Sequence, residues 1–161
     1  MELVGLGAML GNPELLRLHK TAFFASRSSP SEAVTLARGW FEKRCRDNGC
    51  IVSGFQVPLE KVLLDWLLVA GHPLVWVLAR GLALPSFPGA DRALAKGDLL
   101  VVTRYAESVS HPCRDKCRQR NRLIVELSDE IVVAYAAKGG EVAKLCAEIP
   151  AEKPVSFLAK A

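Results

Sequence analysis

The sequence predicts a doubly wound α/β domain, in which a mainly parallel sheet of about five to six strands carries helices on both faces. Short apolar segments alternate along the chain with longer segments whose apolar residues recur every three or four positions. Residues 73–79 form a continuous apolar run, which is typical of a central strand buried on both faces of a parallel sheet. Parallel neighbours need crossover connections, and the helical segments are long enough to supply them.

Six segments are expected to form strands, because they are short, apolar and bounded by glycine, proline or polar residues. They are residues 19–25, 50–52, 73–79, 98–103, 130–136 and 154–158. The 161 residues are expected to form a single domain with one core. Residues 1–17 should then be an N-terminal arm, and residues 150–161 a C-terminal strand or tail.

Helices are expected at residues 30–47, 58–70, 91–96, 113–128 and 141–149. The first begins with a capping-box pattern, because Ser29 precedes Pro30 and Glu32 lies three residues after the cap. The second has a wide apolar face, which suggests burial on two sides or a contact within a homodimer. Gly71 is expected to end this second helix.

The helix at residues 113–128 is basic, and its periodicity separates an inner from an outer face. The stripe that should face the sheet consists of Cys113, Cys117, Arg120, Ile124 and Leu127. A neighbouring stripe, expected to face solvent, carries Arg114, Arg118 and Arg122. Burying an unpaired guanidinium costs several kcal/mol, so Arg120 should meet a carboxylate, a strand-end carbonyl or a bound anion. A structural salt bridge with Glu60 or Asp129 is the competing interpretation.

Three segments that are distant in sequence should converge at the carboxyl edge of the sheet, where ligands of doubly wound folds bind. They are residues 26–27, 53–55 and 138–140. A glycine turn that opens a helix aims backbone N–H groups and the helix dipole at a phosphate. The expected phosphate-binding or nucleic-acid-binding residues are Ser26, Arg27, Ser53, Gly54, Phe55, Arg120, Asn121, Arg122, Lys138, Gly139 and Gly140. Phe55 is the candidate for stacking on a base.

The sequence offers little support for catalysis. Glu60 and Glu141 are the carboxylates that could act as acid or base in an enzyme, although Glu60 also suits ordinary compensation of a helix dipole. Cys113 and Cys117 have one histidine nearby and no second pair of ligands, which does not match a structural zinc site. We therefore expect no metal and no cofactor, and favour binding over catalysis.

Composition narrows the class of protein. Half of the residues are apolar and 24% are charged, as in soluble globular domains, and the net charge of +4 permits an anionic partner. The five cysteines form no disulfide framework. The chain has neither the basic start of a signal peptide nor an apolar run long enough to span a bilayer. A cytoplasmic location and no membrane partner are therefore expected.

Several short motifs resemble a known family. They are Ala25-Ser26-Arg27, Ser53-Gly54, Arg120-Asn121-Arg122 and the run Leu127-Ser-Asp-Glu-Ile-Val-Val133. In this order they resemble the Rossmann-like core of the DNA-processing protein A (Smf) family, over residues 20–149. The resemblance implies a bacterial domain that binds single-stranded DNA during recombination. The wider superfamily also contains LOG-type nucleotide phosphoribohydrolases, of whose signature Pro-Gly-Gly-x-Gly-Thr only Gly139-Gly140 is present.

Three hypotheses for the function follow. The first is a domain that binds single-stranded nucleic acid at the carboxyl edge of the sheet. The second is a nucleotide-binding enzyme or sensor of the same superfamily, with LOG-like hydrolysis as its specific form. The third is a non-catalytic interaction domain whose arginines form structural salt bridges.

Overall fold

The computed structural model describes residues 6–161 of the chain. Its strands are β1 (Ala8–Gly11), β2 (His19–Ala25), β3 (Gly49–Ser53), β4 (Leu74–Leu78), β5 (Leu99–Thr103), β6 (Glu130–Tyr135) and β7 (Val155–Phe157). Its helices are the 3-10 turn η1 (Pro13–Arg17), α1 (Ser31–Arg44), α2 (Pro58–Ala70), α3 (Ala90–Lys96), α4 (Arg114–Leu127) and α5 (Glu141–Glu148). Every helix and strand expected from the sequence is present, with ends shifted by a few residues.

The strands form one sheet in the order β1-β5-β4-β3-β2-β6-β7. All neighbouring pairs are parallel except β1 with β5. This confirms the doubly wound, mainly parallel fold. The N-terminal segment expected to be an arm instead forms the edge strand β1 and the turn η1, so the described sheet has seven strands. Residues 1–5 of that arm lie outside the described part of the chain.

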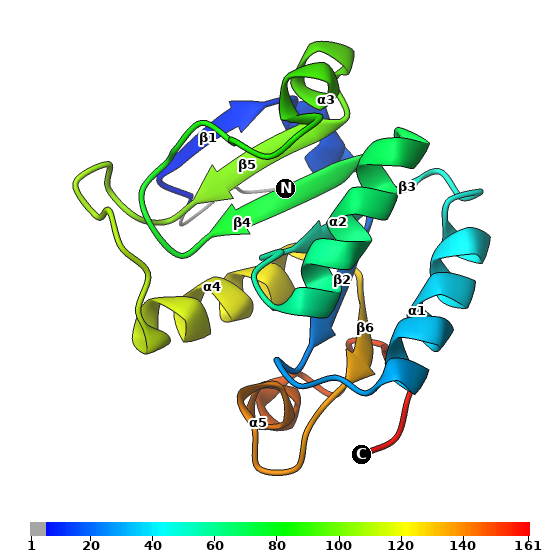
Figure 1. Ribbon diagram of the computed structural model, residues 1–161. Helices are drawn as coiled ribbons and strands as arrows, with labels where there is room; N and C mark the ends of the chain where they lie inside the picture. The colour runs from blue at the N-terminus through cyan, green and yellow to red at the C-terminus, as the bar shows by residue number, and fades with distance from the viewer. Residues whose placement is uncertain (1–5) are drawn as a thin grey trace.

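Helices cover both faces of the sheet (Figure 1). On one face, α1, α2 and α3 pack against inward side chains such as Phe23, Ile51 and Val101. On the other, η1, α4 and α5 pack against the alternate residues, including Phe24 and Val52. Successive strand residues point to opposite faces, so both layers share the same buried strands. This explains the apolar runs without alternation in the sequence.

The start of α1 differs from the expected capping box. The helix begins at Ser31, and no side chain caps it. The Ser29 hydroxyl instead donates to the Ser26 carbonyl at 2.8 Å, because the loop after β2 turns back on itself. Ser29 therefore orders the loop rather than the helix.

The outer face of α2 stays at the surface. Leu63 and Leu67 are fully buried against the sheet, whereas Val62 is 36% and Val69 is 90% exposed. Gly71 ends the helix in the left-handed conformation, as expected. Residues 6–161 contain no helix that is both long and apolar enough to cross a membrane.

Candidate functional site

The fold changes direction between β2 and β6. The chain runs from β2 outward through β3, β4 and β5, then returns to place β6 and β7 on the other side of β2. Ligands of open α/β sheets bind beyond the carboxyl ends of the strands at such a switch point. Because β2 pairs in parallel with both β3 and β6, the segments after these three strands share one edge. This confirms the expected convergence of Ser26, Ser53 and Gly139 at one edge of the sheet.

Ser26 joins the two strands at the switch point. Its hydroxyl accepts the backbone N–H of Ala137 at 2.8 Å, and its own N–H donates to the Tyr135 carbonyl at 2.9 Å. The side chain is largely buried as a result. Ser26 therefore fixes the spacing of β2 and β6 at the floor of the site.

A cavity of about 320 Å³ opens over this edge. Its polar lining includes Ser26, Arg27, Gln56, Glu60, Cys117, Arg120, Asn121 and Glu141. A second hollow of about 400 Å³ shares Arg27, Gln56, Cys117, Asn121 and Glu141 with it, and extends along α4 to Arg114 and Arg118. Because they share walls, the two hollows form one cleft, which we call the edge cleft.

Arg120 is the buried cation of the edge cleft. It is only 6% exposed, as its position on the inward stripe predicts. Its Nε donates to Asn121 Oδ1 at 2.8 Å, and its Nη2 donates to Gln56 Oε1 at 3.0 Å. Both acceptors are neutral amides, and no carboxylate within residues 6–161 lies within 4.0 Å of the guanidinium.

The competing interpretation of Arg120 as half of a salt bridge is therefore wrong for both suggested partners. Asp129 pairs with Lys20 at 3.3 Å. Glu60 is close enough for its charge to raise the pKa of Arg120, but burial has the larger effect and lowers that pKa. A guanidinium still remains charged at neutral pH. The cleft thus contains a buried positive charge without direct compensation.

Gly54 provides the surface on which Arg120 lies. A Cβ added at Gly54 would come within 2.5 Å of Arg120 Nη1 and 2.6 Å of its Cζ. Any side chain at this position would displace the guanidinium. The glycine of the Ser53-Gly54 motif is therefore required by close packing.

The loop after β3 corrects two expectations. The expectation that Phe55 stacks on a base is wrong, because its ring is 4% exposed and belongs to the hydrophobic core, at a residue with a positive φ of 47°. The Ser53 hydroxyl is fully buried and accepts the N–H of Phe55 at 3.3 Å. The structure thus places neither side chain in the lining of the edge cleft. Gln56, which the sequence did not single out, occupies that position instead.

Glu60 lies in the wall of the cleft, but its carboxylate is engaged by backbone N–H groups. It is buried, and its carboxylate accepts the N–H groups of Gln56 at 3.0 Å and of Val57 and Ala25 at 3.4 Å each. Burial raises the pKa of Glu60, and these hydrogen bonds partly offset that effect. Glu60 thus ties the start of α2 to the end of β2, which favours dipole and cap compensation over acid–base chemistry.

The glycine turn before α5 forms one rim of the cleft. Gly139 has a φ of +71°, which suits glycine, and Gly140 lines the cavity directly before the helix. The positive end of the α5 dipole is therefore at the cleft. Lys138 is exposed and does not line it.

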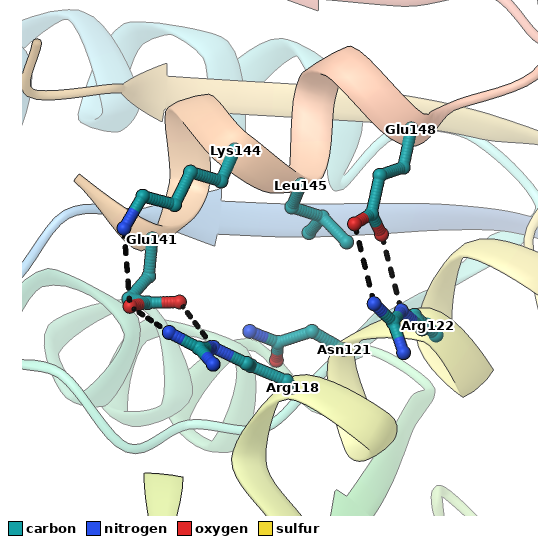
Figure 2. Close-up of a pocket in the computed structure, with 7 residues that line it drawn as sticks. All are labelled: Arg118, Asn121, Arg122, Glu141, Lys144, Leu145 and Glu148. Carbon is teal, nitrogen blue, oxygen red and sulfur yellow. Dashed lines mark hydrogen bonds and ion pairs between the residues drawn. The ribbon is translucent and has the colours of Figure 1, made fainter. Parts of the chain in front are cut away.

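The arginines of α4 differ in their partners (Figure 2). Arg118 donates to both carboxylate oxygens of Glu141, at 2.8 and 2.9 Å, and Arg122 donates to both of Glu148, at 3.1 and 3.2 Å. Arg118 lowers the pKa of Glu141 to about 2. The lowered pKa favours the ionised form of Glu141, which argues against a role as a general acid.

Two exposed arginines of the cleft have no such partner. Within residues 6–161, neither Arg27 nor Arg114 has a carboxylate within 4.0 Å. Both line the edge cleft, one from the loop after β2 and one from the first turn of α4. Together they add accessible positive charge to the cleft that contains the buried Arg120.

The two cysteines near the cleft, Cys113 and Cys117, differ in burial. Cys117 is half-buried beside Gln56. Cys113, which was placed on the inward stripe, is exposed, because it precedes the first residue of α4. In the described part of the chain, no three histidine, cysteine, aspartate or glutamate side chains gather as a metal site would require.

A model of the DNA recombination-mediator protein A family matches residues 8–153. The match extends over nearly the whole chain and confirms the resemblance of the sequence motifs. This chain belongs to that family. No curated protein matches the chain.

Two solved structures of the family share the fold. DNA processing protein A of Streptococcus pneumoniae superposes with a TM-score of 0.77 at 22% identity, covering 92% of this chain and 53% of that one. DNA processing protein A of Helicobacter pylori has a TM-score of 0.68 at 19% identity, with coverages of 92% and 69%. The Helicobacter structure is described as revealing that protein's single-stranded DNA binding mode. The present chain spans about half the length of the Streptococcus protein.

Proposed function

We propose that this domain binds single-stranded DNA through phosphate contacts in the edge cleft, as a cytoplasmic DNA-processing module. The observation that carries the proposal is the buried Arg120 guanidinium, which has only amide partners within the described residues. Burial of a guanidinium that no carboxylate contacts is costly, and a phosphate group would supply an anion in direct contact. The family of this chain and the single-stranded DNA binding described for the Helicobacter protein support the same ligand.

The shape of the cleft favours a strand over a mononucleotide. The cavity at the switch point continues into the hollow beside Arg114. A strand with one phosphate bound in the cavity could therefore extend along α4. With Phe55 buried, recognition should depend on phosphates rather than on base stacking. Binding should therefore tolerate many sequences and respond strongly to salt.

A nucleotide-binding enzyme or sensor is the second candidate. The cavity of about 320 Å³ has the size of a small-ligand pocket, and the buried Glu60 lies in its wall. The engagement of Glu60 by three backbone N–H groups argues against its use in glycosidic hydrolysis. A nucleotide ligand would bind with little dependence on oligonucleotide length.

The first experiment measures the affinity of labelled single-stranded oligonucleotides of increasing length at several salt concentrations. We expect Arg27→Ala combined with Arg114→Ala to weaken binding and to make the log–log salt slope shallower by about 1.4, because each lost phosphate contact contributes about 0.7. The matched control is Arg46→Ala with Arg92→Ala, which removes the same charge from exposed arginines outside the edge cleft. Equal effects of the two double variants, or length-independent binding, would contradict the proposal.

A second experiment tests Arg120 itself. Arg120→Met removes a charge whose burial is costly, but it also leaves Asn121 Oδ1 and Gln56 Oε1 without this donor. We therefore expect Arg120→Met to weaken DNA binding by at least about tenfold, the effect of losing about 1.4 kcal/mol, and to lower the free energy of unfolding by at most about 1–3 kcal/mol. Unfolding in urea and the binding titration would be measured on the same preparation. A destabilised variant with unchanged binding would favour the interaction-domain hypothesis.

We further propose that the exposed outer face of α2 makes a homodimer contact. Val62 and Val69 are exposed there, and Val69 almost completely. Sedimentation of the wild type and of Val69→Lys at rising concentrations would test this. A wild type that stays monomeric would rule it out.

A further inference from the structure

A third hollow of about 310 Å³ lies between α4 and α5, next to the edge cleft. All three hollows share Asn121 and Glu141, so the hollow continues the cleft. Figure 2 shows its side chains reaching across the gap from the two helices. Arg118, Arg122 and Lys144 line it with cationic groups, and Glu141 and Glu148 with carboxylates. Arg118 and Arg122 are joined to Glu141 and Glu148 by ion pairs that bridge the gap, whereas Lys144 pairs with Glu141 within α5.

The arginines of α4 form a row. Arg114, Arg118 and Arg122 follow one another every four residues, about 6 Å apart along the helix axis. That step is comparable to the distance between phosphates in an extended single strand. Arg114 lacks a carboxylate partner in residues 6–161, whereas Arg118 and Arg122 are each held by both oxygens of one glutamate of α5. The charge of Arg114 at the edge cleft is thus accessible, whereas the charges of the next two arginines are neutralised by glutamates.

Each of the two glutamates accepts two hydrogen bonds from one arginine of the row. A carboxylate that accepts two parallel N–H bonds from a guanidinium has the geometry that a phosphate also uses. Both pairs are close to half exposed, at 43% and 42% for Arg118 and Glu141 and at 45% and 51% for Arg122 and Glu148. Water and salt compete with ion pairs at this exposure and weaken them, although two hydrogen bonds hold each pair. A released glutamate would return to solvent, which reduces the cost of its release.

We propose that the gap between α4 and α5 is a further phosphate subsite for single-stranded nucleic acid, which Glu141 and Glu148 occupy until a strand displaces them. The inference rests on the proposed function and extends the binding track from Arg114 to Arg122. The two glutamates act as internal competitors of the ligand and so reduce its affinity. They also select for strands long enough to reach the gap.

The test is a double-mutant cycle on affinity for a labelled single-stranded oligonucleotide. Glu148→Gln keeps the shape of the side chain and removes its charge, and it should tighten binding roughly 2- to 5-fold, the range expected for losing one exposed ion pair. In the presence of Arg122→Ala that gain should vanish. Glu141→Gln with Arg118→Ala forms a second cycle, in which part of the gain should remain, because Glu141 also pairs with Lys144 at 3.9 Å. The control is Glu42→Gln, which removes the same charge from an exposed pair with Arg38 that has one hydrogen bond and lies within α1, outside the cleft.

Each outcome has a distinct meaning. A gain at Glu148→Gln that equals the gain at Glu42→Gln, or that persists with Arg122→Ala, overturns the subsite while leaving the edge cleft in place. A wild type that binds nothing, while Glu141→Gln combined with Glu148→Gln binds, overturns the displacement by a strand, because the glutamates then close the track in the wild type. Failure of every variant to bind overturns both the proposed function and this inference.

Discussion

At the scale of single residues, the site depends on the contact between Arg120 and Gly54. Helical periodicity alone placed Arg120 on the buried face of its helix, and the structure confirms this. The surface that receives it could not be inferred, because Gly54 belongs to a loop more than sixty residues earlier in the chain. Only the fold shows that the missing side chain makes room for a guanidinium.

This contact predicts the effect of Gly54→Ala. The added methyl group would overlap Arg120, so we expect a loss of stability of about 1–3 kcal/mol and weaker DNA binding. Gly39→Ala is the matched control, because a Cβ at Gly39 of α1 meets no atom within 4 Å and should stabilise the exposed helix by about 0.5–1 kcal/mol. Urea unfolding and the oligonucleotide titration would measure both. Similar stabilities for the two variants would show that the Arg120 site relaxes freely.

At the scale of elements, the segments that connect helices to strands contain buried titratable groups, which the periodicity of apolar residues does not reveal. His72 lies in the short connection between α2 and β4, yet it is only 6% exposed. Burial lowers the pKa of His72, the charge of Arg44 lowers it further, and Asp98 opposes this effect. The neutral ring is therefore favoured in the folded protein.

This predicts how stability depends on pH. The unfolded chain takes up a proton on His72 near the ordinary histidine value of about 6.5, whereas the folded protein does so only at lower pH. Unfolding free energy should therefore be unaffected by His72 above pH 6.5 and fall as the pH decreases below it, with a slope of at most about 1.4 kcal/mol per pH unit. His72→Gln should flatten this slope between pH 6.5 and 5, and His111→Gln, at an exposed loop position, should not. Equal slopes in all three proteins would refute the assignment.

At the scale of the whole molecule, the order of the strands creates the site. The return of β6 to the side of β2 brings Ser26 and the glycine turn together, and α4 crosses above them. At the far end of the sheet, β1 covers β5, all of whose residues are buried. An uncovered β5 would expose a row of unpaired backbone groups.

Deletion of residues 1–11 should therefore destabilise the domain and promote self-association. The half-buried Met9 and Leu10 would be lost, at a cost of at least about 2 kcal/mol. Unfolding in urea and light scattering at several concentrations would follow the two effects. A deletion variant that is monomeric and as stable as the full chain would show that β1 is dispensable.

The sequence by itself determined the alternation of strands and helices, the mainly parallel sheet, the edge at which the candidate binding segments meet and the burial of Arg120. These follow from local periodicity and from rules of chain connection, which need no knowledge of distant contacts. Only the tertiary structure decided that Phe55 and Ser53 turn into the core, that Gln56 faces the cleft, and that Arg118 and Arg122 pair with α5. Those outcomes depend on which side chains of distant segments approach within a few ångströms, and pairing of that kind leaves no periodic trace in the sequence.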